Sequence, residues 1–140
     1  MEWIKDTVTI PTQDKGLTPF TGQIRTLIHK WRISEGMCFL FIQHTSASLT
    51  ISENYDPSAR ADIEQFMERA VPEGQPWLTH TLEGPDDSPS HIRSVLTSTS
   101  LAIPIDNGEL NLGAWQGIFL FEHRRGANFR TVLVRCLKVN

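Results

Sequence analysis

The sequence has few cysteines and no long apolar run. Cys38 and Cys136 are the only cysteines, and each lies inside an apolar segment. We therefore expect two buried free thiols rather than a disulfide or a CxxC-type zinc site. The longest uninterrupted apolar run, residues 37–42, is far too short to cross a bilayer. The first residues form no apolar signal segment, which leads us to expect a soluble, cytoplasmic protein without a membrane partner.

Positive charge and the common nucleotide motifs are also scarce. The formal net charge is −3, whereas nucleic-acid binding usually requires a basic face, so we expect no nucleic-acid partner. The chain contains no GxSxG elbow, no glycine-rich phosphate loop and no dinucleotide fingerprint. Its 39% hydrophobic and 21% charged residues are typical of a globular protein, and 140 residues suit one domain spanning 1–140.

Hydrophobic periodicity predicts an α+β protein, in which strands alternate with three helices and a run of strands closes the chain. Asp56 and Pro57 are typical of a helix start, and Asn107-Gly108 is typical of a hairpin turn. The apolar run 37–42 is expected to be a strand covered on both faces. The predicted strands are residues 2–10, 37–42, 48–52, 101–106, 109–112, 115–122 and 130–139; the predicted helices are residues 18–34, one beginning at Pro57 and one beginning at Pro89.

Three of the five histidines lie where a metal ligand would be useful. His44 lies just beyond the end of the predicted strand 37–42, His80 precedes a turn-rich loop, and His91 lies in the first turn of the helix after that loop. Three neutral imidazoles suit zinc and leave one coordination position open, with Asp87 nearby to orient a ligand. The alternative is that each is an ordinary hydrogen-bonded histidine. His29 is expected in solvent, and His123 at the surface or rim.

Other side chains allow weaker hypotheses. Ser46 lies close to His44 in sequence and could suggest a nucleophile with its base. Helix starts at Pro57 and Pro89 offer free backbone N–H groups to an anion, and arginines including Arg130 could contact a phosphate.

Several sequence motifs extend over nearly the whole chain. They are residues 44–50, 53–54, 56–57, 83–84, 86–92, 103–104, 113–118 and 122–124, together with His80 and Ser100. Together these motifs resemble those of the YjbQ family, also called the secondary thiamine-phosphate synthase family.

The resemblance implies a β-sandwich flanked by helices that assembles as a homotrimer. It implies that His44, His80 and His91 bind a divalent metal ion, with zinc expected and magnesium an alternative for synthase chemistry. Around the pocket it implies Asp87, Trp115, Gln116 and Glu122. We predict Asp87 and Glu122 as catalytic groups, and Ser46, Trp115, Gln116 and Arg130 as substrate-binding groups. The segment 123–127 departs from the pattern of many members, which leaves the roles of His123, Arg124 and Arg125 open.

The implied activity joins a pyrimidine diphosphate to a thiazole phosphate and releases pyrophosphate. A three-imidazole site suits a softer ion that activates water or polarises an oxygen, whereas diphosphate departure usually uses Mg²⁺. The principal substrate could therefore be another phosphorylated small molecule. A hypothesis from a different class is a non-catalytic metal- or ligand-binding homotrimer in which the same histidines are structural.

Overall fold

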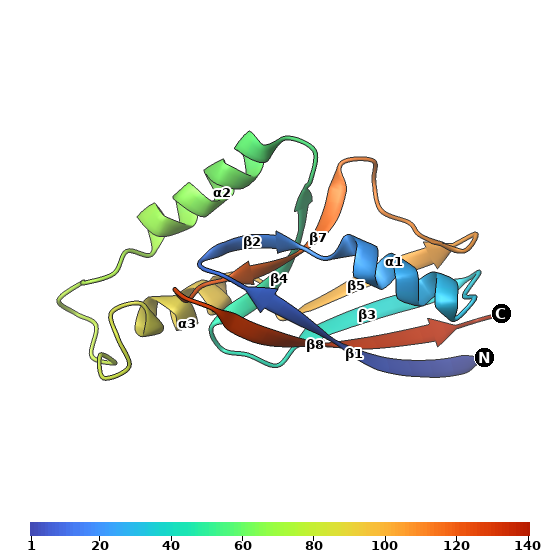
Figure 1. Ribbon diagram of the computed structural model, residues 1–140, viewed down its shortest axis with the longest axis horizontal. Coiled ribbons are helices and arrows are strands. Elements are labelled where there is room, and N and C mark those ends of the chain that lie inside the picture. The colour runs from blue at the N-terminus through green and yellow to red at the C-terminus, as the bar shows by residue number, and fades with distance from the viewer.

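The computed structural model describes residues 1–140 as eight strands and three helices (Figure 1). In chain order the elements are β1 (Glu2–Thr12), β2 (Gly16–Pro19), α1 (Thr21–Lys30), β3 (Gly36–Ile42), β4 (Ala47–Glu53), α2 (Pro57–Ala70), α3 (Asp87–Leu96), β5 (Ser100–Asp106), β6 (Glu109–Leu110), β7 (Gln116–Glu122) and β8 (Asn128–Lys138). None of the helices is long and apolar enough to span a membrane.

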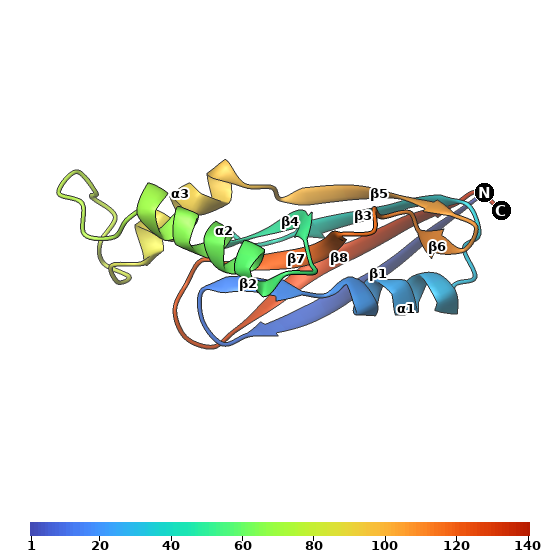
Figure 2. The ribbon, with the colours of Figure 1, turned by 90° about the horizontal axis from the view of Figure 1, so that it is seen from above.

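The strands form two antiparallel sheets that face each other. One has five strands in the order β1-β8-β3-β5-β6, and the other has three in the order β2-β7-β4. Helix α1 runs beside the sheets near the chain termini, while α2 and α3 lie towards the opposite end of the molecule (Figures 1 and 2). The expectation of an α+β fold with helices flanking a sandwich of sheets is confirmed.

One apolar core fills the space between the two sheets and α1. Strand side chains alternate between faces, so every second residue of β3, β7 and β8 points inward. Ile24 and Ile28 of α1 close one side of this core. The strand residues that share it include Ile10, Leu40, Ile42, Leu49, Ile103, Ile118, Leu120, Val132 and Val134.

β7, rather than β3, is the strand covered on both faces. Phe119 and Phe121 point away from the inner core and pack with Met67 of α2. The prediction for residues 37–42 was wrong, since Phe39 is 38% exposed and Phe41 is 47% exposed. The reason is architectural: α2 adds a layer over the three-stranded sheet, but nothing in one chain covers the outer face of the five-stranded sheet.

Local signals gave most element ends correctly, with α1 as the main exception. Asp56 caps α2 by accepting a hydrogen bond from the Ser58 N–H at 2.9 Å, and Asn107 and Gly108 take positive φ angles of 52° and 83° in the hairpin. The predicted helix 18–34 is shorter in the structure. Its first residues belong to the unpredicted strand β2, which pairs with β7.

The candidate site lies where several strands end. Ala47, the first residue of β4, pairs with Glu122, the last residue of β7. The end of α3 is tied to the same sheet by the bridge between Leu49 and Ser98. The long connection from α2 to α3, residues 71–86, extends beyond the sheets at this end (Figure 1).

Candidate metal site

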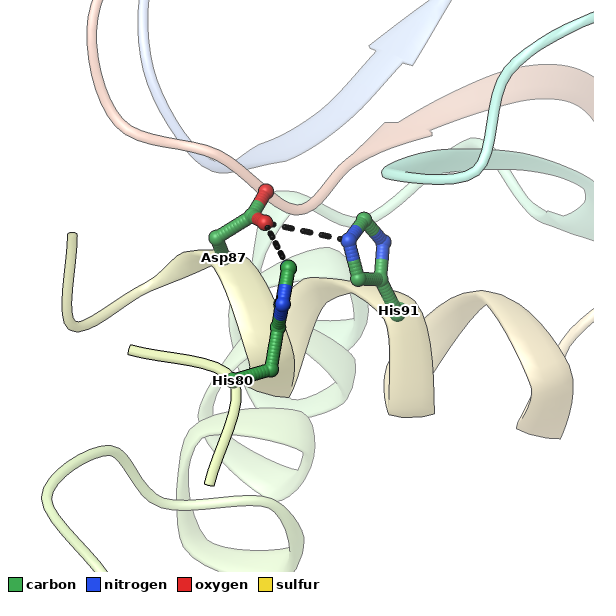
Figure 3. A group of neighbouring side chains, drawn as sticks. All are labelled: His80, Asp87 and His91. Carbon is green, nitrogen blue, oxygen red and sulfur yellow. Dashed lines mark hydrogen bonds and ion pairs between the residues drawn. The ribbon is translucent and has the colours of Figure 1, made fainter. Parts of the chain in front are cut away.

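Two histidines and one aspartate converge at the start of α3. Asp87 is the first residue of α3, and His91 lies one turn later on the same side, as the i, i+4 spacing requires. His80 reaches them from the connection between α2 and α3 (Figure 3). Asp87 Oδ2 lies 2.6 Å from His80 Nε2 and 3.1 Å from His91 Nε2. One ligand atom from each of the three residues therefore lies within 4.8 Å of the others.

Asp87 is a buried carboxylate held in its ionised form. Asp87 is 2% exposed, and burial alone would raise the pKa of its carboxyl group. The hydrogen bond from His80 and the charges of His91 and Arg124 outweigh this effect and lower the pKa below its usual value. A negative charge therefore stands between the two imidazoles at neutral pH.

The contacts of His91 fix which ring nitrogen faces Asp87. His91 Nδ1 lies 2.8 Å from the carbonyl oxygen of Thr45, and because a carbonyl only accepts, Nδ1 must carry the proton. In neutral His91 the lone pair of Nε2 then faces the carboxylate oxygen of Asp87. A proton or a metal ion between these two atoms would remove the repulsion. A backbone carbonyl on the far ring nitrogen is also the usual support of a metal-binding histidine.

Arg124 holds Asp87 from the other side. Its Nη1 donates to Asp87 Oδ1, its Nε donates to Asp86 Oδ2 at 3.0 Å, and its Nη2 donates to the Glu83 carbonyl at 3.1 Å. One oxygen of Asp87 is thus fixed by Arg124 while the other faces the histidines. Arg124 therefore joins the end of β7 to the start of α3 and to the connection that carries His80.

His44 is placed near this cluster but is engaged elsewhere. Its Nε2 accepts a hydrogen bond from the Thr131 N–H at 2.8 Å, and Arg130 Nη1 lies 3.4 Å from its Nδ1. Burial and the charge of Arg130 lower the pKa of His44, which favours the neutral ring. Ligation through Nε2 would require the Thr131 contact to break. Metal binding by His44 stays a prediction, while the third corner of the observed cluster is Asp87.

Glu122 and Arg130 close the polar end of the inner core. Glu122 follows Leu120 on the inward face of β7 and is 0% exposed, while Arg130 precedes Val132 on β8 and is 6% exposed. Arg130 Nε donates to Glu122 Oε1 at 2.7 Å, and Nη2 donates to Oε2 at 2.5 Å. Thr12 Oγ1 and the backbone N–H groups of His123 and Arg124 complete five donors to this carboxylate.

These contacts favour a supporting role for Glu122. Burial opposes its ionisation, but hydrogen bonds from Arg130, Thr12 and the Arg124 N–H lower its pKa. Both oxygens are occupied and the group is shielded from solvent, so a proton has no ready path to it. The catalytic role predicted for Glu122 stays untested, and its geometry suits positioning of Arg130 and His44 better.

An open groove borders the cluster and shares His91 with it. The groove has a volume of about 520 Å³, within the range of roughly 300–1,000 Å³ usual for small-molecule sites. It lies between the segment after β3, one face of α3 and the segment before β5. Its lining residues are His44, Thr45, His91, Ser94, Val95, Thr97 and Thr99.

Two residues expected around the pocket lie far from it within one chain. Gln116 begins β7 and pairs with Glu53, whereas Glu122 ends β7 at the site. At about 3.4 Å per residue, the strand separates these ends by about 20 Å. Trp115 precedes Gln116 and packs edge-to-face on Tyr55 with ring centroids 4.8 Å apart. Ser46 is close to the site, but its carbonyl oxygen, not its hydroxyl, contacts Arg130 and the His123 N–H.

His123 corrects one expectation, and Arg124 and Thr45 show what sequence reasoning missed. His123 was expected at the surface or rim but is 1% exposed and lies 2.9 Å from Ser48 Oγ. It follows Phe121 on the outward face of β7, which α2 covers. The Asp86-Asp87 doublet and an arginine just after β7 could have indicated an ion pair from the sequence. No sequence pattern indicates the contact of the Thr45 carbonyl with His91.

The donor set fits a divalent metal ion. Two imidazoles and one carboxylate form the protein part of several catalytic zinc centres and of non-haem iron centres, in both of which positions remain open to water or substrate. The three ligand atoms lying within 4.8 Å of one another are the observation that supports this fit. These features define an α+β protein with a candidate metal centre at the start of a helix.

The sequence comparisons place the chain within one family. The family described as "UPF0047 protein YjbQ-like" matches residues 6–139, and the chain belongs to this YjbQ family. A UPF0047 protein of Synechocystis is 45% identical over 130 residues, covering 93% of this chain and 88% of that protein. The UPF0047 protein YjbQ of Escherichia coli O157:H7 is 41% identical over 132 residues, covering 94% and 95%.

Solved structures show the same architecture. A conserved hypothetical protein from Thermus thermophilus superposes with a TM-score of 0.84 at 31% identity, covering 94% of this chain and 99% of that one. A YjbQ/UPF0047 family protein from Clostridium acetobutylicum gives a TM-score of 0.82 at 31% identity, with 96% and 99% covered. The resemblance read from the sequence motifs is therefore confirmed for family and fold.

Proposed function

We propose that this chain is a divalent-metal-dependent enzyme acting on a small phosphorylated molecule, with zinc as the metal. The observation that carries the proposal is the convergence of His80, Asp87 and His91 beside an open groove. A bound zinc ion would supply Lewis-acid chemistry, polarising a substrate oxygen or lowering the pKa of water. The groove gives a substrate access to the same place, because His91 belongs to both.

The chain's own residues have distinct parts in this proposal. His80 and His91 present ring nitrogens, and Asp87 presents one carboxylate oxygen while Arg124 fixes the other. The Thr45 carbonyl holds the His91 ring in one tautomer. Glu122 holds Arg130, and Arg130 in turn faces His44 at the groove wall. The side chains that would contact the substrate are therefore held in position by neighbouring residues that would not contact it.

The named activity within this proposal is thiamine-phosphate synthesis. A diphosphate needs positive charge, yet Asp86 and Asp87 occupy the start of α3 and Asp56 caps α2. Neither helix start is thus a free anion site, and Arg130 is largely neutralised by Glu122. In this proposal the phosphate oxygens depend on the metal ion for their binding. Purified protein should then form thiamine phosphate only when metal is supplied.

The alternative hypothesis is a non-catalytic metal- or ligand-binding homotrimer. It is supported by the contacts of Asp87, whose charge two histidines and Arg124 already balance as an ion-pair cluster. Turnover separates the two hypotheses. The enzyme proposal in its named form fails if metal-loaded wild type makes no more thiamine phosphate than the His91→Ala protein does.

Metal content tests the ligand set directly. We expect elemental analysis of protein purified without a histidine tag to show one divalent ion per chain. His91→Ala and Asp87→Asn should each lower metal affinity at least tenfold, as even the loss of a supporting partner costs 10–100-fold. His29→Ala is the matched control, because His29 is exposed and pairs with Glu109 away from the cluster. The ligand set is wrong if His91→Ala and Asp87→Asn retain as much metal as His29→Ala.

His44→Ala decides between the two possible ligand sets. If the observed cluster binds the metal, His44→Ala retains it with an affinity close to that of wild type. If His44 is a ligand, as the sequence resemblance implies, the Thr131 contact rearranges on binding and His44→Ala loses metal as His91→Ala does.

We also propose that the protein assembles as a homotrimer. The outer face of the five-stranded sheet leaves Trp3, Phe39 and Phe41 exposed, with the Trp3 and Phe39 rings 6.2 Å apart. Exposed apolar sheet faces are commonly covered by symmetric association. In a trimer, Trp115 and Gln116 could contact substrate from a neighbouring copy, although they lie about 20 Å from Glu122 along their own strand at about 3.4 Å per residue.

Light scattering tests this assembly. We expect a mass three times the 15.9 kDa of one chain at micromolar concentration. Phe39→Lys should shift the mass towards one chain, whereas Lys30→Ala, at an exposed site on α1, should not. A wild-type mass of one chain would refute the trimer.

A further inference from the structure

Two cysteines face each other across neighbouring strands in the interior of the five-stranded sheet. Cys38 of β3 is paired directly with Cys136 of β8. Both thiols are free and both residues are 0% exposed, as the sequence led us to expect. The candidate metal site uses neither of them, so the function proposed above gives this pair no role.

The hydrogen bonds between β3 and β8 show which kind of pair the cysteines form. At one end of this ladder the Val139 N–H donates to the Glu35 carbonyl, and at the other end the Gln43 N–H donates to the Thr131 carbonyl. Hydrogen-bonded and non-hydrogen-bonded pairs alternate along an antiparallel ladder, so the odd-numbered residues of β3 are the ones that bond to β8. Cys38 therefore lies in a non-hydrogen-bonded pair.

The contact of β3 with its other neighbour agrees with this assignment. Ile42 has the same parity as Cys38, and its N–H donates to the Thr99 carbonyl just before β5 instead of to β8. In a non-hydrogen-bonded pair the Cα atoms are about 4.5 Å apart and the side chains are closest to each other. A disulfide needs Cα atoms about 4.4–6.8 Å apart. Cys38 and Cys136 therefore occupy positions that a disulfide can join without a shift of either strand.

The two thiols also change each other's ionisation. Contact with the Cys38 thiol lowers the pKa of Cys136, although burial opposes this effect. Contact with Cys136, together with burial, raises the pKa of Cys38. When the pair loses one proton, the charge therefore lies on Cys136 and Cys38 stays protonated beside it. A reactive thiolate next to a second thiol is the arrangement in which one sulfur is oxidised first and the other then completes a disulfide.

We propose that Cys38 and Cys136 form an oxidisable dithiol, which hydrogen peroxide converts to a disulfide that joins β3 to β8. The Cys136 thiolate attacks one peroxide oxygen and becomes a sulfenic acid, while the released hydroxide takes up the proton that Cys136 had lost. The Cys38 sulfur then attacks the Cys136 sulfur, and the displaced hydroxyl leaves with the Cys38 proton as water. Two thiols and one hydrogen peroxide thus give one disulfide and two waters.

Burial decides which oxidants can reach the pair. Cys38 and Cys136 belong to the inner core, where Leu40 and Val134 follow the same inward faces of their strands. An oxidant must therefore enter through local opening of the sheet, which favours a small, uncharged molecule over a bulky, charged disulfide such as oxidised glutathione. The same burial makes the reaction slow in the folded protein.

Mass spectrometry tests the disulfide directly. Folded, full-length protein is treated with hydrogen peroxide, quenched with catalase and labelled with N-ethylmaleimide in urea. We expect wild type to take up no label, and its digest to contain the Cys38 and Cys136 peptides joined by a bond that dithiothreitol cleaves. Cys38→Ala and Cys136→Ala are the matched controls, and each should keep its remaining thiol available to the label at the peroxide dose that converts wild type. Oxidised glutathione should leave both wild-type thiols free.

Urea unfolding measures the effect of the bond on the sheet. The disulfide closes a loop that contains most of the chain, so we expect oxidation to raise the urea midpoint by roughly 1–2 M. Dithiothreitol should restore the original midpoint. It does not reduce oxidised methionine, so this reversal assigns the shift to the thiols. Cys136→Ala treated in the same way should show no reversible shift.

The inference is overturned if both wild-type thiols still accept the label after peroxide treatment, if they are lost without a joined peptide, or if the bond joins two chains on a non-reducing gel. It is also overturned if oxidised glutathione joins the cysteines as fast as peroxide does, or if the oxidised protein unfolds at the same or a lower urea concentration than the reduced protein. Circular dichroism verifies that each alanine variant keeps the wild-type fold. Where a variant does not fold, the wild-type digest decides alone.

Discussion

Replacing Glu122 by glutamine removes one charge from the buried pair at the end of the inner core. Arg130 donates to both carboxylate oxygens, through Nε to Oε1 and through Nη2 to Oε2. Whichever way the new amide is turned, its NH₂ group therefore faces an N–H of Arg130. Arg130 is left buried and without a counter-charge, which typically costs about 3–5 kcal/mol. Against a total stability of about 5–15 kcal/mol, this is a large loss.

Urea unfolding at pH 7 and one fixed protein concentration measures this loss. We expect Glu122→Gln to lower the free energy of unfolding by about 3–5 kcal/mol, and the double substitution Glu122→Leu with Arg130→Met to recover much of it, because apolar replacements of buried pairs are often tolerated. Glu109→Gln, at an exposed site, should stay within about 0.5 kcal/mol of wild type. A Glu122→Gln protein within about 1 kcal/mol of wild type would refute the reasoning. Lost activity in that variant alone would thus not identify Glu122 as a base.

Two further predictions concern pH and backbone packing. Burial, followed by the charge of Arg93, lowers the pKa of His123 to about 3. The unfolded chain takes up this proton near pH 6.5, so stability present above that pH is lost as the pH falls. Between pH 7 and 5 we expect the free energy of unfolding, measured with urea, to fall by roughly 2 kcal/mol in wild type and by less in His123→Leu. An equal pH dependence of the two proteins would contradict this prediction. A Cβ on Gly36 would lie 1.9 Å from the Leu137 carbonyl oxygen, whereas one on Gly22 of α1 would meet nothing within 4 Å. Gly36→Ala should therefore destabilise by about 1–3 kcal/mol and Gly22→Ala stabilise by about 0.5–1 kcal/mol, and equal melting temperatures would exclude the clash.

Features with local causes could be predicted from the sequence. The cap at Asp56 and the turn at Asn107-Gly108 depend on side chains and φ angles within a few residues, and both are confirmed. Coverage of a strand depends instead on which layer lies above it. Residues 37–42 and β7 are both strongly apolar, yet only β7 lies under α2. No local pattern distinguishes the two cases.

The same division applies to the candidate site. His80 and His91 were predicted from a turn-rich loop that returns the chain to a helix start, and the structure brings them together. Asp87 was predicted nearby as an orienting group, and it lies at the centre of the cluster. Two other contacts depend on how β8 and β7 are placed. They are the hydrogen bond from Thr131 to His44 and the hydrogen bond from Arg124 to Asp87. Such contacts join residues far apart in sequence, so hydrophobic periodicity and motif spacing cannot predict them.

The end of β7 makes the site sensitive to strand register. Glu122, His123 and Arg124 are consecutive, and they contact Arg130, Ser48 and Asp87 respectively. Successive residues of a strand face opposite sides, so a slip of one residue would put His123 against Arg130 and turn Glu122 towards α2. Glu122, His123 and Arg124 would then each lose the contact given above. The contact of Arg124 with Asp87 therefore depends on the correct pairing of β7, which links the support of the His80–Asp87–His91 cluster to strand register.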